Sequence, residues 1–148
     1  GRGGFRAVPG QESGVKVYGE QRGSALGDYD GDGRVDLVVS QNGAETKLYR
    51  NVKGKAGLRV RLVGAGGNGS GLGAVVRVKR GEAWGPAREV HGGSGYWSQD
   101  SAVQVMGGEG EAREIKVRWP GGKETVAPIP PGAREIEFSQ AGELKALR

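Results

Sequence analysis

Apolar and polar residues alternate with a period of two along most of the chain after residue 57. Leu58, Val60 and Leu62, for example, alternate with Arg59 and Arg61. Successive side chains of a β-strand point to opposite faces, so this period predicts half-buried strands. The stretches with this pattern are 58–63, 74–79, 102–106, 114–119, 125–129 and 134–138, and glycine-rich breaks separate them. Short strands at this spacing predict an all-β fold, an antiparallel β-sandwich or barrel.

The first fifty residues follow a different pattern. An acidic stretch from residue 27 leads into an apolar strand at 35–39, a turn at 41–45 and a second short strand at 47–50. Phe5–Tyr18 is expected to be extended without an obvious partner, and 139–148 to be a short helix or a tail. The stretch 53–57 is a plausible linker, so we expect two segments, 1–54 and 55–148.

Composition narrows the possible classes of protein. The chain has 31 glycines in 148 residues, but no Gly-X-Y register persists, so it is not collagen. It has no cysteine, which excludes disulfides and thiolate metal sites. No apolar run is long enough for a membrane span, and no signal peptide is visible. The chain starts with glycine instead of methionine, which indicates a processed product or a piece of a longer protein.

The acidic stretch "GDYDGDGRVDLVV" holds four carboxylates within nine residues. Asp28, Asp30 and Asp32 alternate on a tight loop, so their side chains converge, and glycines let the backbone turn. Oxygen ligands at this density suit Ca²⁺ better than Mg²⁺, and without a cation the carboxylates would repel one another. An EF-hand would need Glu at position 12, which is Val39, whereas Asp36 stands at position 9. A solvated acidic turn is the alternative.

The spacing D-x-D-x-D-G-x-x-D followed by "LVV" resembles the calcium loop of FG-GAP/VCBS repeats, the blades of integrin-type β-propellers. This resemblance implies a single propeller-blade-like calcium-binding hairpin ahead of the sandwich. It also implies side-chain ligands from Asp28, Asp30, Asp32 and Asp36, with the carbonyl of Arg34 between them. A bound cation would stabilise a hairpin that buries little apolar surface.

The second segment resembles an ASPIC/UnbV domain from about Leu58 to Phe138. The matching stretches are "LRVRLVGAGGNGSGLGAVVRV", "REVHGGSGYWSQDS" and "IKVRWPGGKETV". The order of an FG-GAP/VCBS segment before the domain is also the order typical of that family. One departure is "MGGEG" at 106–110, where the family usually has Gly-Leu-Gly. The resemblance implies a secreted or cell-surface protein and no catalytic residues.

Several other motifs are weaker. Gly64–Gly69 matches G-x-G-x-x-G, but a strand and not a helix is expected next, which excludes a dinucleotide site. Asn68 begins a glycosylation sequon that we expect to be only a loop. His91, the single histidine, has no nucleophile motif near it, so we expect a structural or edge position.

Tyr96 and Trp97 are two large aromatic residues in a Gly/Ser-rich loop. They either pack under the loop or contact a sugar or a protein, because exposed aromatic side chains are good anchors. The basic residues at alternating strand positions predict a solvated outer face, with an acidic polymer as the alternative. They are Arg59, Arg61, Arg77, Lys79, Lys116 and Arg118. No motif supports specific nucleic-acid binding.

One calcium loop corresponds to about one propeller blade, and single repeat units rarely bury their faces alone. We therefore expect a non-catalytic, extracellular, calcium-binding β-protein that assembles with copies of itself into an oligomer or filament through unpaired strands. The alternative is a C-terminal module of a larger surface β-propeller protein that binds a glycan or a protein. Carboxylates outside the loop form no pattern of an active site.

Overall fold

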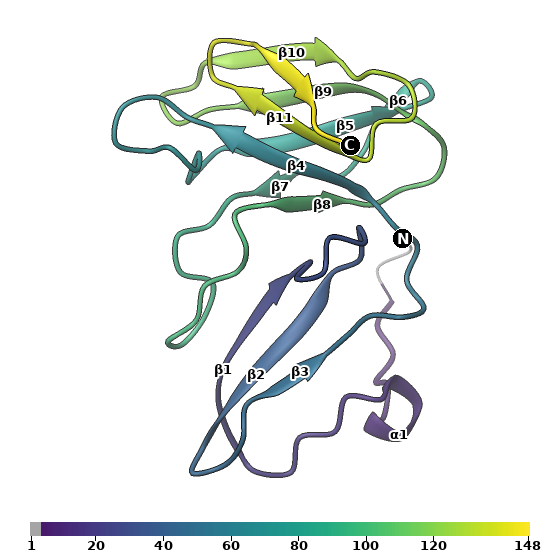
Figure 1. Ribbon diagram of the computed structural model, residues 1–148, viewed down its shortest axis with the longest axis vertical. Helices are drawn as coiled ribbons and strands as arrows, with labels where there is room; N and C mark the ends of the chain where they lie inside the picture. Colours follow the sequence, from purple (N-terminus) through teal and green to yellow (C-terminus); the bar gives the residue numbers. More distant parts are fainter. Residues whose placement is uncertain (1–3) are drawn as a thin grey trace.

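A computed structural model describes residues 4–148, and the chain forms a β-sandwich above a small three-stranded sheet (Figure 1). The sandwich has two sheets. The first has the order β10-β9-β5-β6, with β7 also paired to β5, and the second has the order β12-β11-β4-β8. The strands of the first are β5 (Val75–Arg80), β6 (Ala83–Trp84), β7 (Arg88–Glu89), β9 (Ala112–Arg118) and β10 (Glu124–Pro128). Those of the second are β4 (Leu58–Val63), β8 (Gln104–Met106), β11 (Glu135–Ser139) and β12 (Leu144–Ala146).

The inner faces of the two sheets share one hydrophobic core. Alternate residues of β4 and β11 meet alternate residues of β5 and β9 there, as the period of two requires. The fully buried side chains include Val60, Val76, Ile115, Val117, Trp119, Ile136 and Phe138. Trp119 also satisfies its indole N–H, which donates to the Thr125 hydroxyl at 2.7 Å. The prediction of a β-sandwich is therefore confirmed.

One pairing in the sandwich differs from the expected antiparallel arrangement. β4 and β11 run parallel, with Arg59 opposite Glu135 and Phe138 opposite Leu62, while the other ladders of the described residues are antiparallel. The two strands are far apart in the sequence, so the connection between them can cross the sandwich and return in the same direction.

The expectation of a helix or tail at 139–148 is wrong. Ser139 and Glu143 close a tight turn, in which Gly142 has φ 96°, and β12 then pairs with β11. Leu144 packs against the core from this position. Pairing with β11 and burial of one leucine thus decide the conformation of a segment whose own pattern is ambiguous.

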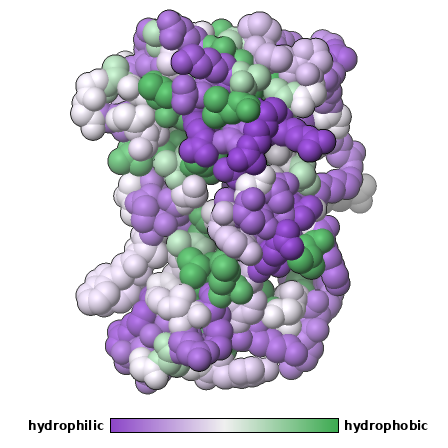
Figure 2. All heavy atoms as spheres, viewed as in Figure 1, coloured by the Kyte–Doolittle hydropathy of each residue, from purple (hydrophilic) through white to green (hydrophobic). Residues whose placement is uncertain are grey.

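The three-stranded sheet has the order β1-β2-β3, formed by β1 (Glu20–Gly27), β2 (Asp36–Asn42) and β3 (Lys47–Tyr49). The stretch Phe5–Tyr18 before it is not extended throughout, because α1 (Gly10–Ser13) makes one helical turn there. Tyr49 on β3 donates its hydroxyl to the carbonyl of Lys16, which fastens this stretch to the sheet. Figure 2 shows hydrophobic residues at the surface over this lower sheet, and Leu26 and Leu48 are about half exposed.

Backbone contacts join the small sheet to the sandwich. Leu26 of β1 accepts a hydrogen bond from the Ser101 N–H at 2.8 Å, and Gly33 accepts one from the Gly57 N–H at 2.8 Å. The residues from Arg50 to Gly57 form no strand, as a linker between two segments requires. Within residues 4–148, no helix has the length and apolar character to cross a membrane.

Candidate metal centre

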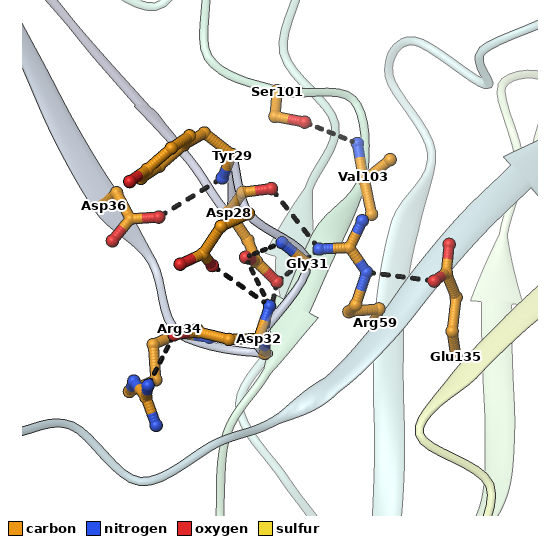
Figure 3. Close-up of polar contacts among 12 residues, drawn as sticks. Asp28, Tyr29, Gly31, Asp32, Arg34, Asp36, Arg59, Ser101, Val103 and Glu135 are labelled. Carbon is orange, nitrogen blue, oxygen red and sulfur yellow. Dashed lines mark hydrogen bonds and ion pairs between the residues drawn. The ribbon is translucent and has the colours of Figure 1, made fainter. Parts of the chain in front are cut away.

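The acidic loop connects β1 to β2 and lies where the small sheet meets the sandwich (Figure 3). Gly31 and Gly33 have φ of 74° and 84°, in the left-handed region where a side chain would be strained. A Cβ on Gly33 would also lie 3.0 Å from the carbonyl oxygen of Gly57. The two glycines therefore let the loop turn tightly while it touches the sandwich.

Asp28 organises the loop. One of its carboxylate oxygens accepts the N–H groups of Gly31 at 2.9 Å and Asp32 at 3.0 Å, and the other accepts that of Gly33 at 2.7 Å. The side chain is 1% exposed and is also paired with Arg59. Burial alone would raise the pKa of Asp28, but the Arg59 and backbone hydrogen bonds outweigh it and lower the pKa. Asp28 is therefore a carboxylate held in its charged form.

Three carboxylates converge in this loop. Asp28, Asp30 and Asp36 each place one oxygen within 4.8 Å of the others. Oxygens on opposite sides of a Ca²⁺ ion, bound at about 2.3–2.6 Å each, are separated by roughly that distance. Asp36 is buried and fixed at both oxygens, by the N–H of Tyr29 at 3.2 Å and that of Asn51 at 2.7 Å. The donor set and its dimensions fit a calcium ion.

Asp32 and Arg34, the other two predicted ligand residues, lie beside this trio and have other contacts. The carboxylate of Asp32 pairs with Arg34 at 2.5 Å and with Arg50 at 3.3 Å. Arg34 also donates to the carbonyl of Asn51 at 2.8 Å. Arg50 reaches Asp30 as well, at 2.6 Å, so two guanidinium groups offset part of the loop's negative charge. The sequence pattern does not indicate Arg50 and Asn51 as contacts of the acidic loop, because they approach it only when β3 pairs with β2.

Arg59 links the acidic loop to the sandwich. Its guanidinium pairs with Asp28 on one side and with Glu135 of β11 at 3.1 Å on the other (Figure 3). Arg59 is 7% exposed, so the prediction that it lies on a solvated face is wrong. Burial alone would lower the pKa of Arg59, yet the two carboxylates raise it, and Arg61 and Arg59 together lower the pKa of the buried Glu135.

The remaining basic residues lie on outer strand positions. Arg61 is partly exposed and pairs with Glu135 at 2.6 Å, and Lys79 pairs with Glu114 at 2.9 Å. Lys116 lies over the Trp84 ring, 4.8 Å from its centroid. Acidic and aromatic partners thus interrupt the positive charge on the outer faces of both sheets, which favours a solvated surface over a site for an acidic polymer.

Tyr96 and Trp97 are exposed at the tip of a hairpin between β7 and β8. Their rings stack with centroids 5.5 Å apart and an angle of 7° between the planes. Trp97 is 87% exposed and Tyr96 59%, so they do not pack under the loop.

His91 lies at the base of the same hairpin, half-exposed, with Nδ1 3.6 Å from the Glu89 carboxylate. Asn68, in the G-x-G-x-x-G stretch, exchanges two hydrogen bonds of 2.8 Å with Leu72 and closes the loop that leads into β5.

Comparison with known proteins gives a family match and three vertebrate relatives. The family described as ASPIC and UnbV matches residues 64–145, which begins after the acidic loop. Cartilage acidic protein 1 of Xenopus tropicalis is 34% identical over 112 residues, which cover 71% of this chain. The proteins of the same name from Mus musculus and Homo sapiens are each 31% identical over 116 residues, or 74% of the chain.

The chain spans a small part of these relatives, 17% of the Xenopus and human proteins and 18% of the mouse protein. The family match covers more than half of the 148 residues, includes the strands β5 to β11 and ends within β12. This chain belongs to the ASPIC/UnbV family.

Proposed function

We propose that this chain is a non-catalytic, extracellular, calcium-binding β-protein whose cation site fastens the small sheet to the sandwich. The observation that carries the proposal is the convergence of Asp28, Asp30 and Asp36 within 4.8 Å. The resemblance of the loop to FG-GAP/VCBS calcium loops supports the choice of ion. So does the chemistry of the donors, which are all hard oxygens.

The trio would supply the side-chain ligands, and the resemblance adds Asp32 and the Arg34 carbonyl. A divalent cation would offset the repulsion among the carboxylates, which Arg34, Arg50 and Arg59 offset only in part. Since Asp28 also holds Arg59 of β4, the loop is tied to the sandwich as well as to the ion. A three-stranded sheet buries little apolar surface by itself, so binding free energy at this loop would stabilise it.

An extracellular location is supported by the relatives, which are named for cartilage. The small share of those proteins that this chain spans supports a module that works within a larger polypeptide. The proposed absence of catalysis rests on the carboxylates of the loop, which the proposal assigns to the cation and to backbone N–H groups. His91 adds to this, because its closest acidic partner, Glu89, is 3.6 Å away and beyond a hydrogen bond.

Calcium titration of the folded chain by calorimetry and thermal unfolding tests the proposal. At a calcium concentration about 100-fold above Kd, the stabilisation should be about 2.7 kcal/mol, which is roughly 5–10 °C in Tm. Asp30→Asn should abolish most of this shift. Glu109→Gln is the matched control, because Glu109 also pairs with a basic side chain, Lys55 at 3.1 Å, but lies away from the loop. Equal shifts in the two variants, or no shift in the unmodified chain, would refute the calcium site.

Self-association is a second candidate, and the sheet order supports it. β3, β10 and β12 are outermost strands, each paired on one side within the described chain. On one of these outermost strands, β10, the side chain of Val126 is 52% exposed. An outer strand with unpaired backbone groups can add a strand from a copy of the chain. Assembly of this kind would make the protein structural and not only a calcium binder.

A further inference from the structure

We propose that Tyr96 and Trp97 form a stacking platform for a neutral pyranose ring of a glycan. The site lies outside the proposed calcium loop, although its hairpin docks on Leu26, two residues before Asp28. Its first support is exposure, because two large stacked rings in water are unfavourable unless something covers them.

The backbone at the platform is strained. Trp97 has φ 49°, and it is the non-glycine residue with a positive φ in the described part of the chain. That conformation is unfavourable for a bulky side chain and is usually kept where function requires it. A glycine at position 97 would relieve the strain, so the tryptophan lowers stability through its backbone angle, and its exposed ring gains little from burial in return.

The hairpin beneath the rings is well fixed. Ser94 and Ser98 bond through the backbone at 3.2 Å, and the Asp100 N–H donates to the Ser94 hydroxyl at 2.7 Å. Gln99 donates to the carbonyl of His91 at 2.8 Å across the hairpin. Asp100 also accepts the N–H of Leu26 at 2.8 Å, which docks the hairpin on β1. A fixed platform loses little entropy when a ligand binds.

The small exposed area of the Tyr96 and Trp97 rings indicates a small ligand. Glycine, serine, glutamine and aspartate surround the two rings in the stretch 92–100. A stable protein interface buries about 1,200–2,000 Å², which two side chains on a polar loop do not provide. A single sugar ring matches a platform of this area. The C–H groups of a pyranose are attracted to the negative face of an aromatic ring.

The charges and polar groups near the rings indicate that the ligand is neutral. The hairpin from His91 to Ser101 contains no lysine or arginine and one carboxylate, Asp100, and β1, which contacts the hairpin at Gly23, adds one basic residue, Arg22. Single-stranded nucleic acid and acidic polysaccharides need a positive groove beside the stacking rings. The Tyr96 hydroxyl and the Trp97 indole N–H have no hydrogen-bond partner within residues 4–148, and both side chains are mainly exposed. Free polar edges beside an apolar face suit a neutral polyol.

The test is a titration of the full chain with neutral hexasaccharides of glucose, mannose, galactose and N-acetylglucosamine. A chondroitin sulfate hexasaccharide and oligo(dT) serve as anionic comparisons. At least one neutral hexasaccharide should bind in calorimetry. Trp97→Ala should weaken it at least about tenfold, and Trp97→Phe, which keeps a ring, should weaken it less. Tyr18→Ala, which removes an exposed aromatic ring elsewhere, should leave binding unchanged.

A ligand-binding role and a structural role for Trp97 predict different melting temperatures for a variant that lacks its side chain. Trp97→Gly should abolish binding while Tm stays the same or rises, because the strain is relieved. A lower Tm would show that the rings stabilise the hairpin and would overturn the proposal. Binding of none of the neutral hexasaccharides, binding of the anionic probes alone, or equal binding by Trp97→Ala would overturn it too. So would a change in self-association caused by Trp97→Ala, which would identify the rings as a contact between copies.

Discussion

Arg59 is charged at a position that is 7% exposed, and carboxylates on two sides compensate for it. Arg59→Met should therefore lower the free energy of unfolding at pH 7 by about 3–5 kcal/mol, because it leaves the buried Asp28 without a cationic partner, while Glu135 keeps Arg61. Urea denaturation measures this. Arg61→Met is the matched control, since Arg61 shares Glu135 but is 45% exposed, and its loss should be about 1 kcal/mol or less.

The stability lost in Arg59→Met should depend on pH, because Glu135 must be charged to pair with Arg59. The pKa of Glu135 is lowered from its ordinary value of 4.5 in the folded chain, because Arg61 and Arg59 outweigh burial. Its stabilising contribution is then complete above that value and is lost as pH falls through the lower folded pKa. The difference between the unmodified chain and Arg59→Met should shrink below about pH 4. A difference that is constant from pH 7 to pH 3 would contradict the role of the ion pairs.

The spacing of aspartates in the loop is local information, so the sequence indicates Asp28, Asp30 and Asp36 together with the glycines between them. The partners of these side chains come from elsewhere. Arg59 follows Asp28 by 31 residues, and its place in an alternating strand predicts exposure. Only the approach of the loop to β4 buries it. Ion pairs between residues of different sheets leave no periodic pattern in the sequence. The sequence therefore does not predict the network of Asp28, Arg59 and Glu135.

At the scale of elements, the hairpin from His91 to Ser101 depends on a glycine in β1. A Cβ on Gly23 would lie 2.7 Å from the carbonyl oxygen of Tyr96, too close for an undisturbed backbone. Gly23→Ala should push the hairpin off β1 and destabilise the chain by about 1–3 kcal/mol. It should also expose the amides of Leu26 and Ser101 to hydrogen exchange. Gly67→Ala is the control, because nothing lies within 4 Å of that position, and an equal effect of both changes would refute the close contact.

The strands with an alternating or continuous apolar pattern could be predicted, β2 and β3 among them, whereas β1 and β12 could not. β4 is found at 58–63 as its leucines and valines predict, and β5, β9, β10 and β11 lie within about two residues of the predicted ranges. β1, with the sequence EQRGSALG, has no apolar face and becomes a strand through its pairing with β2. β12 likewise depends on β11. Elements that owe their conformation to a neighbour carry a weak signal of their own.

At the scale of the whole molecule, self-association should be measurable as particle size. Light scattering in millimolar calcium and again after chelation should show larger particles in calcium, if the loop sets the strand edges in place. Asp30→Asn should behave like the chelated chain. Equal sizes in every condition would reject calcium-dependent assembly, and the calcium site would then serve the fold of a single chain.

The parallel pairing of β4 with β11 has a consequence for how the protein is made. Arg59 and Glu135 are 76 residues apart, and β4 cannot pair with β11 until both strands have been synthesised. At about 5–20 residues per second, β4 leaves the ribosome roughly 4 to 15 s before its parallel partner. During this interval the inner face of β4, with Leu58, Val60 and Leu62, has no partner from β11. Contacts this distant slow folding, so β4 is the segment that a chaperone would have most reason to hold.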